Sequence, residues 1–170
     1  RFLLTLLIVL SSFRAEAETV HFPSIAVGRV PAGPAISGWL YHPGGTGPFP
    51  AIVLAHTCGG VNDHTDEWGR RLAGWGYVTV APDSFRPRGQ TSVCANGAVG
   101  PGARVADMAG AIDFLNALPS VRRGHIGLMG HSHGGGTAVL AAQAGFKLEE
   151  RGLRAVVAYY PVCGTQYERF

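Results

Sequence analysis

Charged side chains are scarce in this chain: Asp, Glu, Lys and Arg make up 15% of its 170 residues, against 46% hydrophobic residues. This balance excludes an intrinsically disordered chain, because enough apolar surface is present to form a core. The formal net charge is only +3 and the basic residues are scattered, so nothing favours a nucleic-acid partner. A chain of this length is sufficient for one domain.

Long apolar runs are missing too. The run at residues 2–10 follows a single arginine and is too short to span a bilayer. Ala15 and Ala17 match the small residues of a signal-peptidase cleavage site. We therefore expect residues 1–17 to be a secretory signal peptide, and residues 18–170 to be periplasmic or secreted, without a stable membrane partner. A buried N-terminal helix or a membrane anchor is the alternative.

Cysteine is also rare, and the three in the chain are Cys58, Cys94 and Cys163. In an oxidising compartment they could form one disulfide within the chain and leave one thiol free. Three pairs are possible, and the spacing does not choose among them. Three small buried thiols are the alternative.

Short apolar runs alternate with helical patterns from residue 51 onward. The predicted buried strands are residues 51–56, 77–81, 125–130 and 155–160, and the predicted helices are residues 65–75, 103–118 and 134–145. Before them, residues 25–30 and 36–42 fit shorter extended segments. Strands that are apolar on both faces and alternate with helices predict an α/β fold, with a mostly parallel sheet and helices on both faces.

The pentapeptide GHSHG at residues 130–134 matches the G-x-S-x-G pattern, between a predicted strand and a predicted helix. In such a nucleophile elbow the serine lies in a sharp, strained turn with its hydroxyl above the edge of the sheet. Glycines two positions before and after avoid collisions with neighbouring backbone. The following helix points its N-terminus at the developing oxyanion. We therefore predict that Ser132 is a catalytic nucleophile.

Other uses of this segment have less support, and a plain glycine-rich turn remains an alternative. A phosphate-binding loop requires a lysine where Gly136 stands. A metal site could use His131 and His133, but a sharp turn splays them, and no Cys or Asp is close in sequence. We expect both histidines to pack around the elbow, and we expect no metal and no cofactor.

An acyl-transfer serine also requires an oxyanion hole. One donor is the backbone N–H of the residue after the nucleophile, here His133, and the other comes from a loop after an earlier strand. The segment AHTCGG at residues 55–60 is in that position. We therefore predict the Cys58 N–H as the second donor.

With these residues placed, the chain resembles the α/β-hydrolase superfamily and, within it, the dienelactone hydrolase family. The matching segments are AIVLAHTCGGVN, LAGWGYVTVAPDSFRPRG, GHSHGGG and AVVAYYPVCG, between about residues 50 and 164. The resemblance implies hydrolysis of a small-molecule ester or lactone. Serine replaces the cysteine of the best-known members, which favours a broader esterase. The resemblance also places His56 in the oxyanion loop and Asp83 on the rim of the active site, so both are candidates for substrate binding.

The acid and the histidine of a catalytic triad are not evident. In α/β-hydrolases they follow the serine along the chain. After Ser132 the sequence has no aspartate, its later acids are Glu149, Glu150 and Glu168, and its last histidine is His133. We therefore expect residues 18–170 to be the N-terminal part of an α/β-hydrolase domain that lacks the last strands. A substitute base, His56 or His64, is the alternative.

Overall fold

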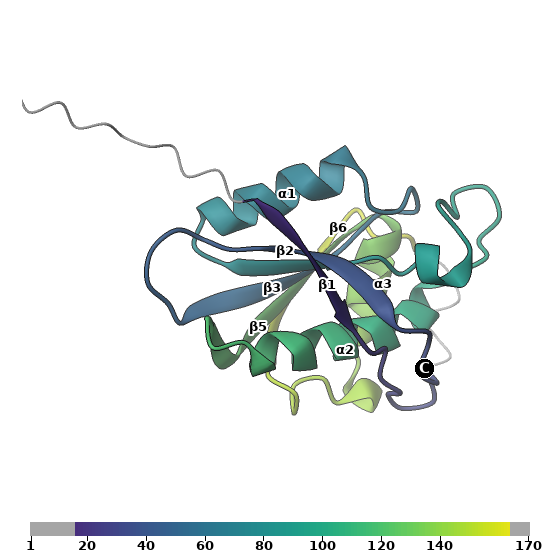
Figure 1. The fold of residues 1–170 in the computed structure, drawn as a ribbon. Coiled ribbons are helices and arrows are strands. Elements are labelled where there is room, and N and C mark those ends of the chain that lie inside the picture. The colour runs from purple at the N-terminus through teal and green to yellow at the C-terminus, as the bar shows by residue number, and fades with distance from the viewer. Residues whose placement is uncertain (1–15, 164–170) are drawn as a thin grey trace, which may run out of the picture.

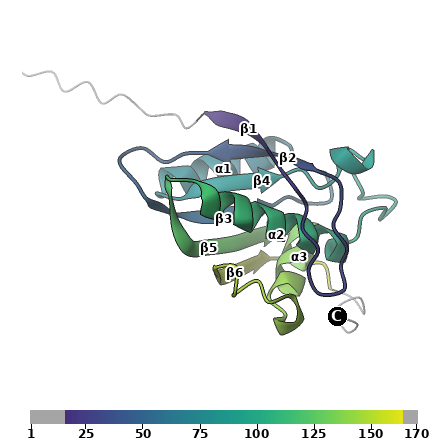
Figure 2. The ribbon, with the colours of Figure 1, turned by 60° about the horizontal axis from the view of Figure 1, so that its bottom comes forward.

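The protein's structure, a computed structural model, describes residues 16–163. Within them, six strands form one sheet in the order β1-β2-β4-β3-β5-β6, which runs from top to bottom in Figure 2. The strands are β1 (Ala17–Phe22), β2 (Ile36–Tyr41), β3 (Phe49–Ala55), β4 (Val78–Pro82), β5 (Val121–His131) and β6 (Leu153–Tyr159). The last four pair in parallel, whereas β1 and β2 are antiparallel to their neighbours. The sheet is mostly parallel, as predicted.

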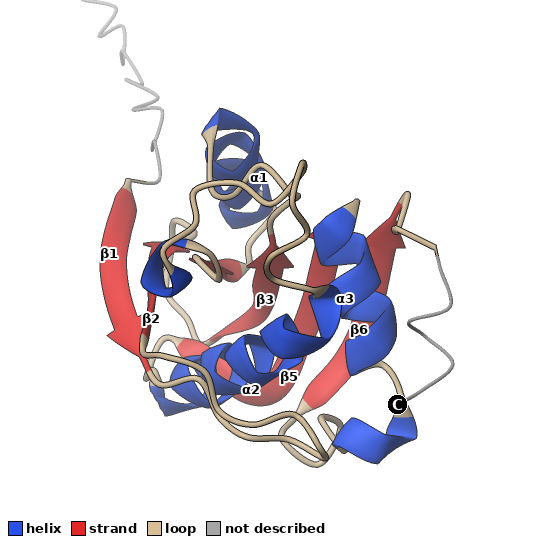
Figure 3. Ribbon diagram, turned by 90° about the vertical axis from the view of Figure 1, so that its right-hand side faces the viewer, coloured by secondary structure: helices blue, strands red, loops and turns tan. Residues whose placement is uncertain are grey.

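Helices cover both faces of the sheet (Figures 1 and 3). α1 (Asp63–Gly74) lies on one face, and α2 (Pro101–Ala117) and α3 (His133–Ala141) lie on the other. The larger core lies between α2, α3 and the sheet and includes Ile112. A smaller core lies under α1 and includes Leu72. The apolar stripes that predicted the helices thus face the sheet.

Local sequence explains where these helices begin and end. Asn62 is the N-cap of α1, and its side-chain oxygen accepts a hydrogen bond of 3.4 Å from the Thr65 backbone N–H. Gly76, just beyond α1, has φ +91°, a left-handed conformation that glycine adopts easily. Pro101 occupies the first turn of α2, where its missing N–H costs nothing.

The N-terminal region differs from the prediction. Residues 25–30 do not form an extended segment but fold into a tight turn closed by a single bridge between Val27 and Val30. β1 was not predicted, because it is an edge strand whose exposed residues, such as Glu18 and Thr19, interrupt the apolar pattern. Residues 1–15, most of the expected signal peptide, lie outside the described residues.

α3 is shorter than the predicted helix at residues 134–145. It ends at Ala141, and Gln143 then adopts an extended backbone before a short 3₁₀ turn at Ala144–Phe146. Alanine and glycine dominate both the helix and the turn, so the composition did not mark the boundary.

β6 forms one edge of the sheet, and its side chains on the α1 side are exposed. Val157 and Tyr159 of this strand, with Trp68 and Trp75 from α1 and its end, line an apolar groove of about 200 Å³. Among the described residues, no helix is long and apolar enough to cross a membrane.

Candidate active site

Ser132 occupies the turn between β5 and α3 with φ 52° and ψ −113°, a conformation that side-chain-bearing residues rarely adopt. Two glycines make this turn possible. A Cβ on Gly130 would stand 2.1 Å from the Gly134 carbonyl oxygen, and one on Gly134 would stand 2.1 Å from the Ala55 oxygen. The backbone thus has the strained strand–turn–helix geometry of a nucleophile elbow.

The elbow is also joined to the end of β6 and to the chain that follows it. The Ser132 N–H donates to the Tyr159 carbonyl at 3.0 Å, and the Val162 N–H donates to the Ser132 carbonyl at 3.2 Å. Tyr160, between them, has a positive φ of 34° and is 63% exposed. Ser132 therefore lies at the carboxyl end of the parallel strands, where open α/β sheets bind their ligands.

The two histidines beside Ser132 diverge, as the sharp turn predicts. The His131 ring stacks on Tyr159, with ring centres 5.1 Å apart, and lies 5.0 Å from the Trp68 ring. The His133 ring lies on the α2 side, where Nδ1 is 2.8 Å from Arg104 Nη1. Each histidine packs against a different layer, so the two rings do not converge on one point.

Burial keeps both rings neutral at ordinary pH. It lowers the pKa of His131 to about 4, with a smaller contribution from the nearby His64. Burial likewise lowers the pKa of His133 to about 4, and the positive charge of Arg104 makes a smaller contribution in the same direction. His64 itself packs edge-on against His131, with ring centres 4.8 Å apart.

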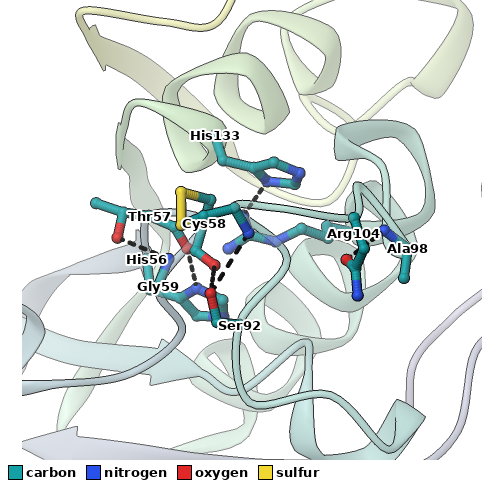
Figure 4. The surroundings of a disulfide bond; sticks show 10 residues. His56, Thr57, Cys58, Gly59, Ser92, Ala98, Arg104 and His133 are labelled. Carbon is teal, nitrogen blue, oxygen red and sulfur yellow. Dashed lines mark hydrogen bonds between the residues drawn. A yellow bond between two sulfur atoms is a disulfide. The ribbon is translucent and has the colours of Figure 1, made fainter.

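The loop after β3, which carries the predicted second oxyanion donor, is held by a disulfide between Cys58 and Cys94 (Figure 4). Sequence alone left three pairs open, and the structure selects this one and leaves Cys163 free and exposed. The Cys58 carbonyl also accepts hydrogen bonds from the Val93 N–H at 2.8 Å and from Ser92 Oγ at 3.2 Å. The disulfide and these bonds together fix the peptide at Cys58 against the loop that follows β4.

His56 has both ring nitrogens engaged and is only 2% exposed. Nδ1 lies 2.8 Å from the Thr57 carbonyl, and Nε2 accepts a hydrogen bond of 3.3 Å from the Ser84 N–H. Burial, with the charge of Arg104 next, holds the pKa of His56 well below its usual value. These contacts shape the loop, so they favour a structural role for His56 over contact with substrate or action as a base.

Asp83 is likewise buried, and its carboxylate organises the turn after β4. It accepts hydrogen bonds from the backbone N–H groups of Phe85 and Arg86, each 3.0 Å long, and pairs with the Arg86 side chain at 3.0 Å. These contacts give Asp83 a structural role in the turn. The substrate contacts of His56 and Asp83 stay predictions.

Sequence reasoning missed the charged residues of α2. Arg104 and Asp107 are fully buried, and Asp107 forms two hydrogen bonds of 2.9 Å with Arg88. A signal was present, because Arg104 lies four residues before the buried Met108 and therefore on an inward face of the helix.

The mostly parallel sheet, the helices on both faces and the elbow define an α/β-hydrolase fold. The model of the dienelactone hydrolase family matches residues 36–169, and the chain belongs to that family. The bis(hydroxyethyl) terephthalate hydrolase of Streptomyces coelicolor is 32% identical over 113 residues, which cover 63% of this chain and 33% of that protein.

Solved structures share the fold. The dienelactone hydrolase-like promiscuous phosphotriesterase P91 from metagenomic libraries has a TM-score of 0.64 at 24% identity, covering 85% of this chain and 59% of that one. The esterase Est22 has a TM-score of 0.67 at 16% identity, covering 90% and 46%. The chain spans 33% to 48% of the length of the first curated relatives it matches.

Proposed function

We propose that the full-length protein is a serine hydrolase that cleaves carboxylic esters or lactones through an acyl-enzyme on Ser132. The observation that carries the proposal is the conformation of Ser132, a non-glycine residue at φ 52° directly before a helix. Strain of this kind persists where the surrounding structure enforces it, and it is concentrated at functional sites.

The reaction follows the acyl-transfer scheme. Ser132 Oγ attacks the substrate carbonyl carbon while a histidine base takes the hydroxyl proton. The backbone N–H groups of Cys58 and His133 stabilise the negative oxygen of the tetrahedral intermediate. The C–O bond then breaks, the alcohol leaves with the proton, and water hydrolyses the acyl-enzyme. In this proposal the base is a histidine oriented by an acid, and both follow Ser132 in the full-length protein, in the chain order of α/β-hydrolases.

Labelling of the full-length protein with a fluorophosphonate tests the role of Ser132. We expect stoichiometric labelling that Ser132→Ala abolishes. The matched control is Ser120→Ala, which removes a hydroxyl from the turn before β5 and should leave labelling unchanged. Labelling that persists in Ser132→Ala would overturn the assignment.

A hydrolase-like binding protein without catalysis is the second candidate. Such a protein would lack the acid and the histidine that follow the nucleophile in α/β-hydrolases. A full-length sequence without a downstream Asp or Glu and His, together with an absence of fluorophosphonate labelling, would support it.

A panel of substrates addresses the chemical class. The name of the Streptomyces relative motivates aromatic diesters such as bis(hydroxyethyl) terephthalate, and the family name motivates lactones. We expect p-nitrophenyl esters and at least one of these classes to be hydrolysed.

We also propose a periplasmic or secreted location, supported by the leader-like residues 1–17 and the Cys58–Cys94 disulfide. Fractionation of cells that express the full-length protein tests it, and recovery in the cytoplasm would contradict it.

A further inference from the structure

Arg104 is one of the largest fully buried side chains among the described residues. It lies in the first half of α2, and its guanidinium points at the His133 ring beside the oxyanion loop (Figure 4). Nη1 is 2.8 Å from His133 Nδ1, and Cζ lies 5.1 Å from the centre of the Phe85 ring. A cation inside the core is therefore in direct contact with the residue that follows the candidate nucleophile.

Burying this charge is expensive, and among the described residues the two nearby carboxylates, Asp107 and Asp83, favour the charged form without forming an ion pair with Arg104. Asp107, the closest acid in sequence, is held by both terminal nitrogens of Arg88 at 2.9 Å. Asp83 is held by Arg86. Within residues 16–163, Arg104 Nε and Nη2 have no hydrogen-bond partner. Burial lowers the pKa of Arg104 to about 9, so it still carries its proton at neutral pH.

The chemistry of this contact fixes the protonation of His133. A guanidinium can only donate hydrogen bonds, so His133 Nδ1 must be the unprotonated acceptor and Nε2 carries the hydrogen. The ring also has a hydrogen bond to the Val99 backbone, which raises the pKa as a carbonyl acceptor does. His133 is thus held from α2 on one side and from the loop before α2 on the other.

We propose that Arg104 is a positioning residue, which locks the His133 ring in its Nε2–H form and thereby fixes the backbone N–H of His133 in the oxyanion hole. The second half rests on the proposed function, whereas the first half does not. His133 is the first residue of α3, so a side chain held at both ring nitrogens restrains the backbone of that residue, including the N–H that follows Ser132. Oxyanion donors act only when they are aimed before the reaction begins.

The test compares three substitutions in the full-length protein. Arg104→Met removes the donor and keeps an unbranched side chain, and Arg104→Lys keeps a charged donor. Arg88→Met breaks the neighbouring buried pair with Asp107 without removing the donor to His133. This variant therefore measures how disturbed packing around α2 alone affects the His133 tautomer and ester hydrolysis.

The first measurement is the ¹⁵N spectrum of histidine-labelled protein, which reads the tautomer whether or not the protein is catalytic. We expect the Nε2–H form at His133 in the unsubstituted protein and in Arg88→Met. Arg104→Met should show a tautomer mixture and a higher His133 pKa, because the nearby positive charge is gone. An Nδ1–H form in the unsubstituted protein would overturn the proposal, even if no variant folds.

The second measurement is ester hydrolysis. We expect kcat to fall about 10-fold to 100-fold in Arg104→Met with KM nearly unchanged, and Arg104→Lys to recover part of the loss. Equal losses in Arg104→Met and Arg88→Met would reduce Arg104 to a packing role and overturn the positioning claim. An unsubstituted protein without hydrolysis would instead contradict the proposed function, and the tautomer result would stand separately.

Discussion

Gly134 lies directly against Ala55: a Cβ on Gly134 would stand 2.1 Å from the Ala55 carbonyl oxygen and 2.6 Å from that of His56. The first turn of α3 therefore packs backbone to backbone on the end of β3. This contact sets the distance between the elbow and the oxyanion loop, since Ser132 and Cys58 lie at either side of it. The φ of Gly134 is not in the left-handed region, so its backbone conformation does not require glycine. Glycine is required here because there is no room for a Cβ.

We expect Gly134→Ala to lower the free energy of unfolding by about 3 kcal/mol, because overpacked methyl groups in a rigid interior force the backbone apart. Gly74→Ala is the control. It adds the same methyl group near the end of α1, where no atom lies within 4 Å. That change should be neutral or stabilise by up to about 1 kcal/mol. Urea denaturation of both variants measures the difference, and equal stabilities would contradict the close approach.

Asp107→Asn should destabilise the protein by about 3 kcal/mol, because it leaves Arg88 without its charged partner and removes a negative charge near Arg104. The matched control is Glu67→Gln, which breaks an exposed pair with Arg71 on α1. Exposed pairs contribute about 0 to 1 kcal/mol. Thermal unfolding should therefore separate the two variants clearly, and similar melting temperatures would mean that the buried pair contributes little.

The sequence predicted best the elements that bury apolar side chains on both faces. β3, β4 and the second half of β5 carry that signal, and the residues flanking Ser132 carry the signal of the elbow. β6 has an apolar sequence, although its side chains on the α1 side are exposed. The sequence pattern did not predict β1, because half of the side chains of this edge strand face solvent. The Arg104–His133 contact was not predicted, because the two residues are 29 positions apart and meet only through the geometry of their side chains. No local pattern encodes the distance between the surfaces of two helices.

The Cys58–Cys94 disulfide should stabilise the folded protein by about 4 kcal/mol, because it closes a loop with a sequence separation of 36 residues in the unfolded chain. We expect the double variant Cys58→Ser, Cys94→Ser to melt at a lower temperature and to resemble the reduced protein. Cys163→Ser, which removes the exposed free thiol, should leave the melting temperature unchanged. If a reductant still lowered the melting temperature of the double variant, the stabilisation that reduction removes would come from a different disulfide.

His131 should make the protein sensitive to mild acid. Its pKa in the folded protein is about 4, below the ordinary value of 6.5, so the unfolded chain binds the proton first. The stability that depends on neutral His131 is complete above pH 6.5 and is lost as the pH falls from 6.5 towards 4, by up to about 1.4 kcal/mol per pH unit. His131→Phe keeps a ring against Tyr159 and Trp68 but cannot titrate. Urea denaturation across this range should give a shallower slope for the variant, with the remainder from His56 and His133. An identical slope in both proteins would mean that His131 does not titrate in this way.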